Sequence, residues 1–99
     1  MQGWSVYIVR CADGTLYTGV ATDVARRVGE HNSHKFLAAN YTRARRPVTL
    51  VYSEAVATRS AACKREYQIK QLSRQEKEAL VAATARSGLK SNLKQRDIT

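Results

Sequence analysis

The chain has few of the residues that cross-link a protein or anchor it in a membrane. Its two cysteines, Cys11 and Cys63, lie far apart, and neither belongs to a Cys-x-x-Cys motif or a Cys/His cluster. We therefore expect no disulfide framework and no zinc site, but reduced thiols in a cytoplasmic protein. No segment approaches the ~20 consecutive apolar residues that a membrane-spanning helix needs.

The chain also lacks internal boundaries. It contains no sequence repeat, no low-complexity tract and no linker, and Arg10 and Asp13 interrupt the apolar run that a signal peptide would need. A length of 99 residues suits one small domain with a modest core. We expect that domain to span residues 1–87, and residues 88–99, which lack periodicity, to form a flexible basic tail.

Acidic residues are scarce. Seventeen Lys and Arg residues stand against eight Asp and Glu residues, which gives a formal net charge of +9 at pH 7. This balance indicates a polyanionic partner, and nucleic acid is the first candidate. A membrane surface is the weaker candidate, because no basic helix shows a continuous bulky apolar face.

A β-hairpin is expected near the start of the chain. Residues 4–11 and 16–20 are β-rich and flank Asp13-Gly14, a typical hairpin turn. With a two-residue loop, the numbers of paired residues would sum to 27, and Tyr7 and Tyr17 would lie on opposite faces. With a three-residue loop and a left-handed glycine, the sum would be 26, and the two tyrosines would share a face.

The hydrophobic pattern favours the three-residue loop. That register collects the larger apolar side chains on one face, namely Trp4, Val6, Ile8, Leu16 and Val20. The opposite face then holds small, polar and phenolic residues, namely Ser5, Tyr7, Val9, Cys11, Tyr17 and Gly19. This composition suggests the floor of a cleft more than a packing surface.

A helix and a long loop are expected after the hairpin. Thr22 or Asp23 supplies the helix N-cap, and apolar residues recur after it at helical spacing. Arg27 and His31 are four residues apart, so they stand one turn above each other beside the buried seam of this helix. Residues 33–46 form a segment rich in basic residues. It shows no periodicity, and we expect it to form a loop.

One strand and two helices complete the expected order. Residues 48–53 read as the strand, and Thr58 caps a helix that runs to about Gln71. A capping box over residues 73–76 starts a third helix, which ends near Gly88. The order β-β-α-β-α-α predicts an α+β fold with a small, largely antiparallel sheet covered by helices.

The second expected helix carries one inward-facing carboxylate. Ala62, Glu66 and Ile69 share a face, which directs Glu66 toward the interior. A charge in that position is costly unless it has a partner or a ligand. Glu66 could also pair with Lys70 one turn later on the surface, and periodicity does not distinguish the two arrangements.

Four sequence patterns follow one another over residues 4–82. They read "VYIVRC.DGTLYTG", "D...R..EHN", "YTR.RRPV.LVY" and "KRE.QIK.LSR.EK.AL". Together they resemble the GIY-YIG nuclease family, and in particular its short stand-alone bacterial proteins of the YhbQ type. The resemblance implies a three-stranded antiparallel sheet flanked by helices, and metal-dependent hydrolysis of DNA phosphodiester bonds.

The same resemblance implies roles for five residues. Tyr7 matches the general base for the attacking water, and Tyr17 matches a tyrosine that contacts phosphate or positions that water. Arg27 matches an arginine that offsets charge on the phosphorane, and His31 matches a proton-relay or phosphate-contacting histidine. Glu66 matches the carboxylate that holds one divalent ion, Mg²⁺ or Mn²⁺.

The chain departs from the family pattern at several places. Ser5-Val6-Tyr7 stands where the family has Gly-Ile-Tyr, and Tyr17-Thr18-Gly19 has threonine in place of isoleucine. Residues 33–40 lack the glycines expected of relatives and contain Phe36-Leu37, so we expect substrate entry to differ. Short proteins of this type lack the DNA-recognition domain of the homing enzymes, which implies low sequence specificity.

Basic and aromatic residues outside the catalytic set are candidates for nucleic-acid binding. These candidates are Arg26, Lys35, Tyr41, Arg43, Arg45 and Arg46. Interleaved aromatic and basic side chains suit phosphate contact with some stacking. The plainer alternative is that such charges are solvated, above all Arg26 on the exposed side of its helix.

Each functional assignment has a structural alternative. Tyrosines in hairpins most often form cross-strand packing, and a histidine near a helix end most often pairs with the helix dipole. Two functions stay open at this point: a DNA nuclease of repair or processing, and a catalytically weak nucleic-acid-binding module on the same scaffold. The sequence leaves open DNA versus RNA, branched versus single-stranded substrates, and the oligomeric state.

Overall fold

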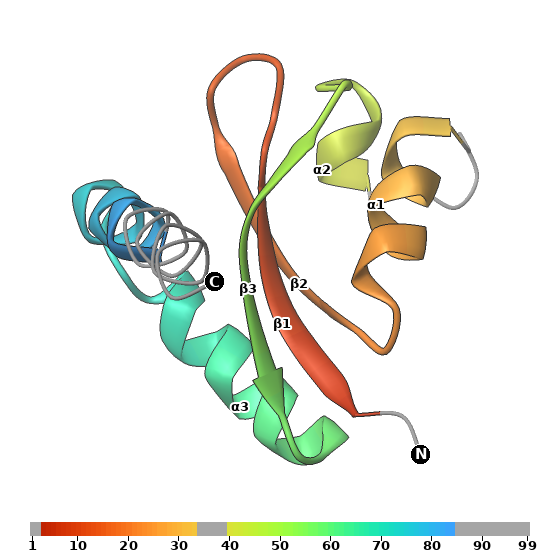
Figure 1. The fold of residues 1–99 in the computed structure, drawn as a ribbon. Helices are drawn as coiled ribbons and strands as arrows, with labels where there is room; N and C mark the ends of the chain where they lie inside the picture. Colours follow the sequence, from red (N-terminus) through yellow and green to blue (C-terminus); the bar gives the residue numbers. More distant parts are fainter. Residues whose placement is uncertain (1–2, 34–39, 85–99) are drawn as a thin grey trace, which may run out of the picture.

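The fold is built on a three-stranded antiparallel sheet. The computed structural model describes residues 3–33 and 40–84, and its strands are β1 (Trp4–Arg10), β2 (Leu16–Ala21) and β3 (Thr49–Val56). The strand order is β2-β1-β3, and β1 is antiparallel to both neighbours (Figure 1). The expected α+β architecture is thereby confirmed, and β2 is an edge strand.

The hairpin has the three-residue loop. Tyr7 pairs with Gly19 and Val9 pairs with Tyr17, so the paired numbers sum to 26. The Cys11 N–H donates to the Thr15 carbonyl oxygen at 2.8 Å, and Gly14 has a positive φ of 88°. Glycine is needed at this turn because other residues adopt that conformation only at a cost.

Helices cover both faces of the sheet. They are α1 (Val24–Ser33), α2 (Asn40–Arg43), α3 (Arg59–Lys70) and a last helical segment over residues 74–84. In Figure 1, α1 and α2 lie on one side of the sheet, and α3 and the last segment lie on the other. Within residues 3–33 and 40–84, no helix has the length and hydrophobicity needed to cross a membrane.

The helix starts follow the capping signals of the sequence. Asp23, not Thr22, caps α1, because its carboxylate accepts from the Arg26 N–H at 3.0 Å. Thr58 caps α3 by accepting from the Ala61 N–H at 3.0 Å. Ser73 and Glu76 satisfy each other's backbone N–H groups at 3.1 and 2.8 Å, which is the expected capping box.

Two expectations for the middle of the chain were wrong in part. The end of the expected loop 33–46 is helical, because Thr42 of α2 is buried beneath α1 and this packing outweighs weak helix propensity. The strand expected over residues 48–53 extends to Val56, because β3 pairs with β1 as far as Trp4. The expected helix end near Gly88, Lys35 and the expected tail lie outside the described residues.

Each face of the sheet carries its own buried cluster. On the side of α3 and the last segment, the cluster consists of Val6, Ile8 and Tyr52 from the sheet and Ala62, Ile69 and Val81 from the helices. Against α1 lie Tyr7, Val9, Cys11, Ala21 and Val48. The central strand is therefore buried on both sides, with four consecutive residues, Val6 to Val9, at most 2% exposed. The face with the tyrosines is packed, and the expected open cleft floor is not observed there.

Candidate active site

Tyr7 reaches across the neighbouring strand because its partner is a glycine. Tyr7 lies on β1 and pairs with Gly19 on the edge strand β2. A Cβ added to Gly19 would lie 2.6 Å from the Tyr7 hydroxyl oxygen and 2.7 Å from its ring carbon Cζ. Any side chain at residue 19 would thus displace the phenol, which lies over β2 and points toward the outer edge of the sheet.

His31 joins two hydroxyl groups in the interior. Its side chain, near the end of α1, is fully buried. Its Nε2 lies 2.9 Å from the Tyr7 Oη, and its Nδ1 lies 2.8 Å from the Thr42 Oγ1. A neutral imidazole has one donor and one acceptor nitrogen, so His31 accepts from one hydroxyl and donates to the other.

Burial keeps this histidine neutral. It is the main cause that lowers the pKa of His31, the positive charge of Arg27 lowers it further, and Glu30 acts in the opposite direction. The imidazole is therefore an uncharged hydrogen-bonding group at neutral pH, and its unprotonated nitrogen is able to accept a proton.

Tyr7 is also protonated at neutral pH. Burial, followed by the nearby Tyr17, raises the pKa of Tyr7 to about 12, although Arg27 lowers it through its charge and a hydrogen bond. Glu66 adds a smaller increase to this pKa, which places its carboxylate within electrostatic range of the phenol. Tyr7 is therefore not a phenolate before the reaction begins. To act as a base, it needs a neighbour that accepts its proton.

Arg27 is held in place by an acid that the sequence reading missed. Its guanidinium donates to the Glu30 carboxylate at 3.0 Å, and Arg26 donates to the same carboxylate. The hydrogen bond from Arg27 lowers the pKa of Glu30, so this acid stays charged. Arg26, expected to bind nucleic acid, is thus partly neutralised, although its side chain is 58% exposed.

Glu66 makes the surface pair that the sequence allowed and also faces the site. On α3, Ala62 and Ile69 are fully buried, and Glu66 between them is half-buried. Its carboxylate lies 3.1 Å from the Lys70 Nζ, and that ammonium lies 6.0 Å from the centre of the Tyr17 ring. The ion pair therefore lies beside Tyr17, near the edge strand.

One carboxylate of this region suits a hard metal ion that has few protein ligands. In the described part of the chain, no group of three or more His, Cys, Asp or Glu residues is placed to hold a metal. A single carboxylate fits Mg²⁺, which keeps several waters and binds phosphate oxygens. Glu66 suits this role, because its carboxylate is half-buried and interacts electrostatically with the phenol of Tyr7.

The basic residues of the middle segment are only partly available. Tyr41 stacks on Tyr17 with the ring centres 5.8 Å apart, and the Arg45 guanidinium lies 4.0 Å from the Tyr41 ring centre. Arg45 also pairs with Asp13 at 3.1 Å. The Arg46 Nε donates to the Arg43 carbonyl oxygen, while Arg43 itself is exposed. Tyr41 therefore supports Tyr17 more than it offers an open ring for base stacking.

The structure thus brings the five expected catalytic residues into one region and adds Thr42. Thr42 is fully buried and contacts the catalytic histidine candidate, yet it carries no charge itself and the basic segment around it shows no periodicity. Its only sequence signal is its place in the "YTR" pattern. Lys35 is the one expected nucleic-acid contact that lies in an undescribed segment.

Comparison with known proteins finds one matching domain profile and several similar proteins. Residues 3–79 match the profile of the GIY-YIG catalytic domain. A UPF0213 protein of Desulfotalea psychrophila is 62% identical over 81 residues, which cover 82% of this chain and 73% of that protein. A UPF0213 protein of Staphylococcus saprophyticus is 52% identical over 77 residues, which cover 78% of this chain and 92% of that protein.

Two solution NMR structures are similar in fold. The UPF0213 protein of Bacillus halodurans is 43% identical, with a TM-score of 0.52 over 84% of this chain and 85% of that one. A protein of E. faecalis is 35% identical, with a TM-score of 0.56 over 86% of this chain and 90% of that one. The matched region contains both tyrosine strands, α1 and α3, and the chain belongs to the GIY-YIG family, a superfamily of nucleases.

Proposed function

We propose that this protein is a metal-dependent nuclease that hydrolyses DNA phosphodiester bonds with low sequence specificity, in DNA repair or processing. The observation that carries the proposal is the 2.9 Å contact between the Tyr7 hydroxyl and the buried His31 imidazole, with Arg27 and Glu66 acting on the same phenol. Membership of a nuclease superfamily supports nucleic acid as the substrate.

The proton has a direct path in this arrangement. Tyr7 Oη takes a proton from the attacking water while its own proton passes to His31 Nε2. This exchange avoids a free phenolate, which the raised pKa of Tyr7 disfavours. In this mechanism the His31 Nδ1–H donates to the Thr42 hydroxyl, which makes Nε2 the acceptor nitrogen.

Charge on the phosphate needs cationic partners. The guanidinium of Arg27 offers a planar fork that matches phosphate oxygens, and Glu30 fixes its position on α1. A divalent ion, Mg²⁺ or Mn²⁺, held by Glu66 would add positive charge beside the phosphate and lower the pKa of a bound water. Tyr17, which is half-buried at the edge strand, positions that water or contacts the phosphate.

A binding module is the second candidate. Tyr7 is only 2% exposed, and Glu66 is paired with Lys70, so in this conformation the phenol has little access to solvent and the carboxylate already has a cationic partner. A protein that binds DNA through its positive surface and never opens this site would have little activity. The charge of +9 is compatible with either candidate.

The test is a cleavage assay on labelled single-stranded, duplex and branched DNA with Mg²⁺, Mn²⁺ or EDTA. Glu66→Gln keeps the side-chain shape and removes the charge. Tyr67→Phe on the same helix is the control, because Tyr67 is 66% exposed. Products that require metal, vanish in Glu66→Gln and persist in Tyr67→Phe would support the nuclease. Binding without cleavage under every condition would favour the second candidate.

A further inference from the structure

A groove lies next to the candidate active site and contains none of the five candidate catalytic residues. Its floor is the start of β2, at Thr15 and Leu16, and its walls are Tyr41 of α2 and the first turn of the last helix, at Arg74 and Lys77. Because α2 and the last helix cover opposite faces of the sheet, the groove crosses the outer edge of β2.

The groove continues directly from the active-site region. Leu16 in its floor precedes Tyr17 in the chain. Tyr41 in its wall stacks on the Tyr17 ring at 5.8 Å. A strand of nucleic acid with a phosphate beside Tyr17 would therefore lead into this groove along the edge strand.

Positive charge exceeds negative charge around the groove. Glu78 accepts two hydrogen bonds from Arg10, at 2.7 and 2.9 Å, so its charge is already matched. Arg74, with a 61% exposed side chain, donates to Glu78 at 3.3 Å and to the Gly14 carbonyl at 2.8 Å. Within the described ranges, the Lys77 ammonium makes no ion pair.

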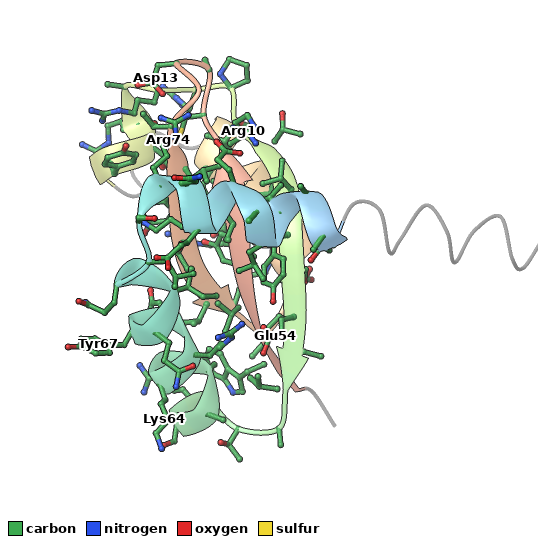
Figure 2. The ribbon with its side chains drawn as sticks, turned by 90° about the vertical axis from the view of Figure 1, so that its left-hand side faces the viewer. Arg10, Asp13, Glu54, Lys64, Tyr67 and Arg74 are labelled. Atoms are coloured by element: carbon green, nitrogen blue, oxygen red, sulfur yellow. The ribbon has the colours of Figure 1, made fainter. Side chains whose placement is uncertain are left out.

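Arg10 and Arg74 thus share the one carboxylate of Glu78 at this end of the molecule, and Lys77 adds a third cation beside them. Asp13, at the hairpin turn, pairs with Arg45 and so does not offset the charges of these three cations. Figure 2 shows Arg10, Asp13 and Arg74 together near the hairpin, whereas Lys64 and Tyr67 lie away from them on α3. The guanidinium of Arg74 is oriented by Gly14 and keeps further N–H donors for an anion.

We propose that this groove binds a backbone phosphate of the nucleic acid next to the scissile bond, through Arg74 and Lys77. This inference rests on the proposed function, because it places the strand that the active site would cut. Phosphate contacts fix the position of a strand without reading its bases, which agrees with low sequence specificity. The groove therefore sets where the backbone lies and leaves the choice of sequence open.

The test compares two double variants that lose the same charges. Arg74→Gln with Lys77→Gln removes the groove cations, and Arg59→Gln with Lys64→Gln removes one arginine and one lysine from the exposed first half of α3. DNA binding is measured over a range of salt concentrations in EDTA, so that cleavage does not interfere. Lys77→Gln alone disturbs no ion pair among the described residues, and it covers the case that loss of Arg74 harms folding.

The salt dependence gives the expected result. Each phosphate contact contributes about −0.9 to the slope of log K against log salt on duplex DNA and about −0.7 on single strands. Because the proposal places one phosphate in the groove, the groove double variant should make the slope shallower by about one unit, Lys77→Gln by up to the same amount, and the α3 control by almost none. Equal slopes in the groove and control variants, or no DNA binding by the wild type, would overturn the proposal.

The groove proposal and the nuclease proposal can be rejected independently of each other. A shallower slope in the groove variants without any metal-dependent cleavage by the wild type would keep the groove and reject the nuclease. Metal-dependent cleavage with unchanged slopes in the groove variants would keep the nuclease and reject the groove.

Discussion

At the scale of single residues, two uncharged side chains determine the geometry of the candidate site. Gly19 leaves the space that the Tyr7 ring occupies, and Thr42 contacts the nitrogen of His31 that faces away from Tyr7. The charged residues Arg27 and Glu66 act on a phenol whose place is already fixed by these contacts. Under the proposed mechanism, orientation and proton transfer therefore depend on packing as much as on charge.

Tyr7→Phe tests the proton-transfer role. The change removes one oxygen from a packed ring and leaves His31 Nε2 without its 2.9 Å partner. We expect cleavage to fall roughly 100-fold or more, which is the usual contribution of a general base, while DNA affinity stays close to wild type. Single-turnover cleavage and binding in EDTA measure the two quantities. A variant as active as the wild type would remove Tyr7 from the role of base.

Thr42→Val tests whether Thr42 orients His31. Valine has nearly the shape of threonine, but it leaves the His31 Nδ1 unpaired in the interior, at a cost of about 1–3 kcal/mol of folding stability. We expect slower cleavage and a changed balance of imidazole tautomers in ¹⁵N NMR spectra. Thr42→Ser keeps the hydroxyl and should restore both. Unchanged tautomers in Thr42→Val would contradict an orienting role, even if stability drops.

At the scale of elements, the last helix is joined to the sheet by one ion pair between distant parts of the chain. Arg10 on β1 and Glu78 on the last helix form two parallel hydrogen bonds, and Leu80 and Val81 of that helix pack on the buried cluster beneath it. The hydrogen bonds from Arg10 lower the pKa of Glu78 to about 2. The helix is therefore held by apolar contacts and by a charge that acid removes.

Glu78→Gln should show this dependence on pH. The folded pKa lies below the ordinary value of 4.5, so the stabilisation is complete above pH 4.5 and is lost as the pH falls toward 2. We expect a lower Tm than wild type at pH 7, and a difference that shrinks below pH 4.5. Thermal unfolding followed by circular dichroism measures it. Arg10→Gln should give the same pattern, and the double variant should add little. A difference that is constant with pH would contradict the ion pair.

The sequence predicted those elements that have local signals. Asp13-Gly14 predicted the hairpin, and Thr58 and Ser73 predicted two helix starts, because turns and caps depend on a few adjacent residues. The hydrophobic pattern of the two strands then predicted the hairpin register. It did not predict α2, whose four residues are too few for a periodic pattern. Nor did it predict the burial of Tyr7, because periodicity assigns a face of a strand but not what covers that face.

At the scale of the whole molecule, the two helical layers cover different sets of contacts. The layer of α3 and the last helix covers an apolar cluster, and the layer of α1 and α2 covers the tyrosine and histidine contacts. The sheet between them belongs to both, and its edge strand β2 adjoins Tyr41, Lys70 and the basic groove. The Tyr7–His31 contact thus lies on the α1 side of the sheet, and Glu66 of α3, the proposed metal ligand, lies near the edge strand between the two layers.

Removal of metal should therefore separate activity from stability. Both buried clusters consist of protein side chains, and Glu66 pairs with Lys70 when no ion is bound. We expect EDTA to abolish cleavage and to leave the Tm of the protein within about 1–2 °C of its value in Mg²⁺, because one weakly held ion adds little stability. Differential scanning calorimetry and a cleavage assay in the same buffers test this. A large drop in Tm on chelation would indicate a structural metal.

The contact between Tyr7 and Gly19 also constrains how this sequence can change over evolution. The two positions lie on different strands, yet the Tyr7 ring occupies the volume that any side chain at residue 19 would need. A lineage that replaces the glycine must also shrink the tyrosine or shift the strand register, and the tyrosine cannot change first without emptying that volume. We expect the two positions to covary among homologues, so that the tyrosine and the glycine are inherited or lost as one unit.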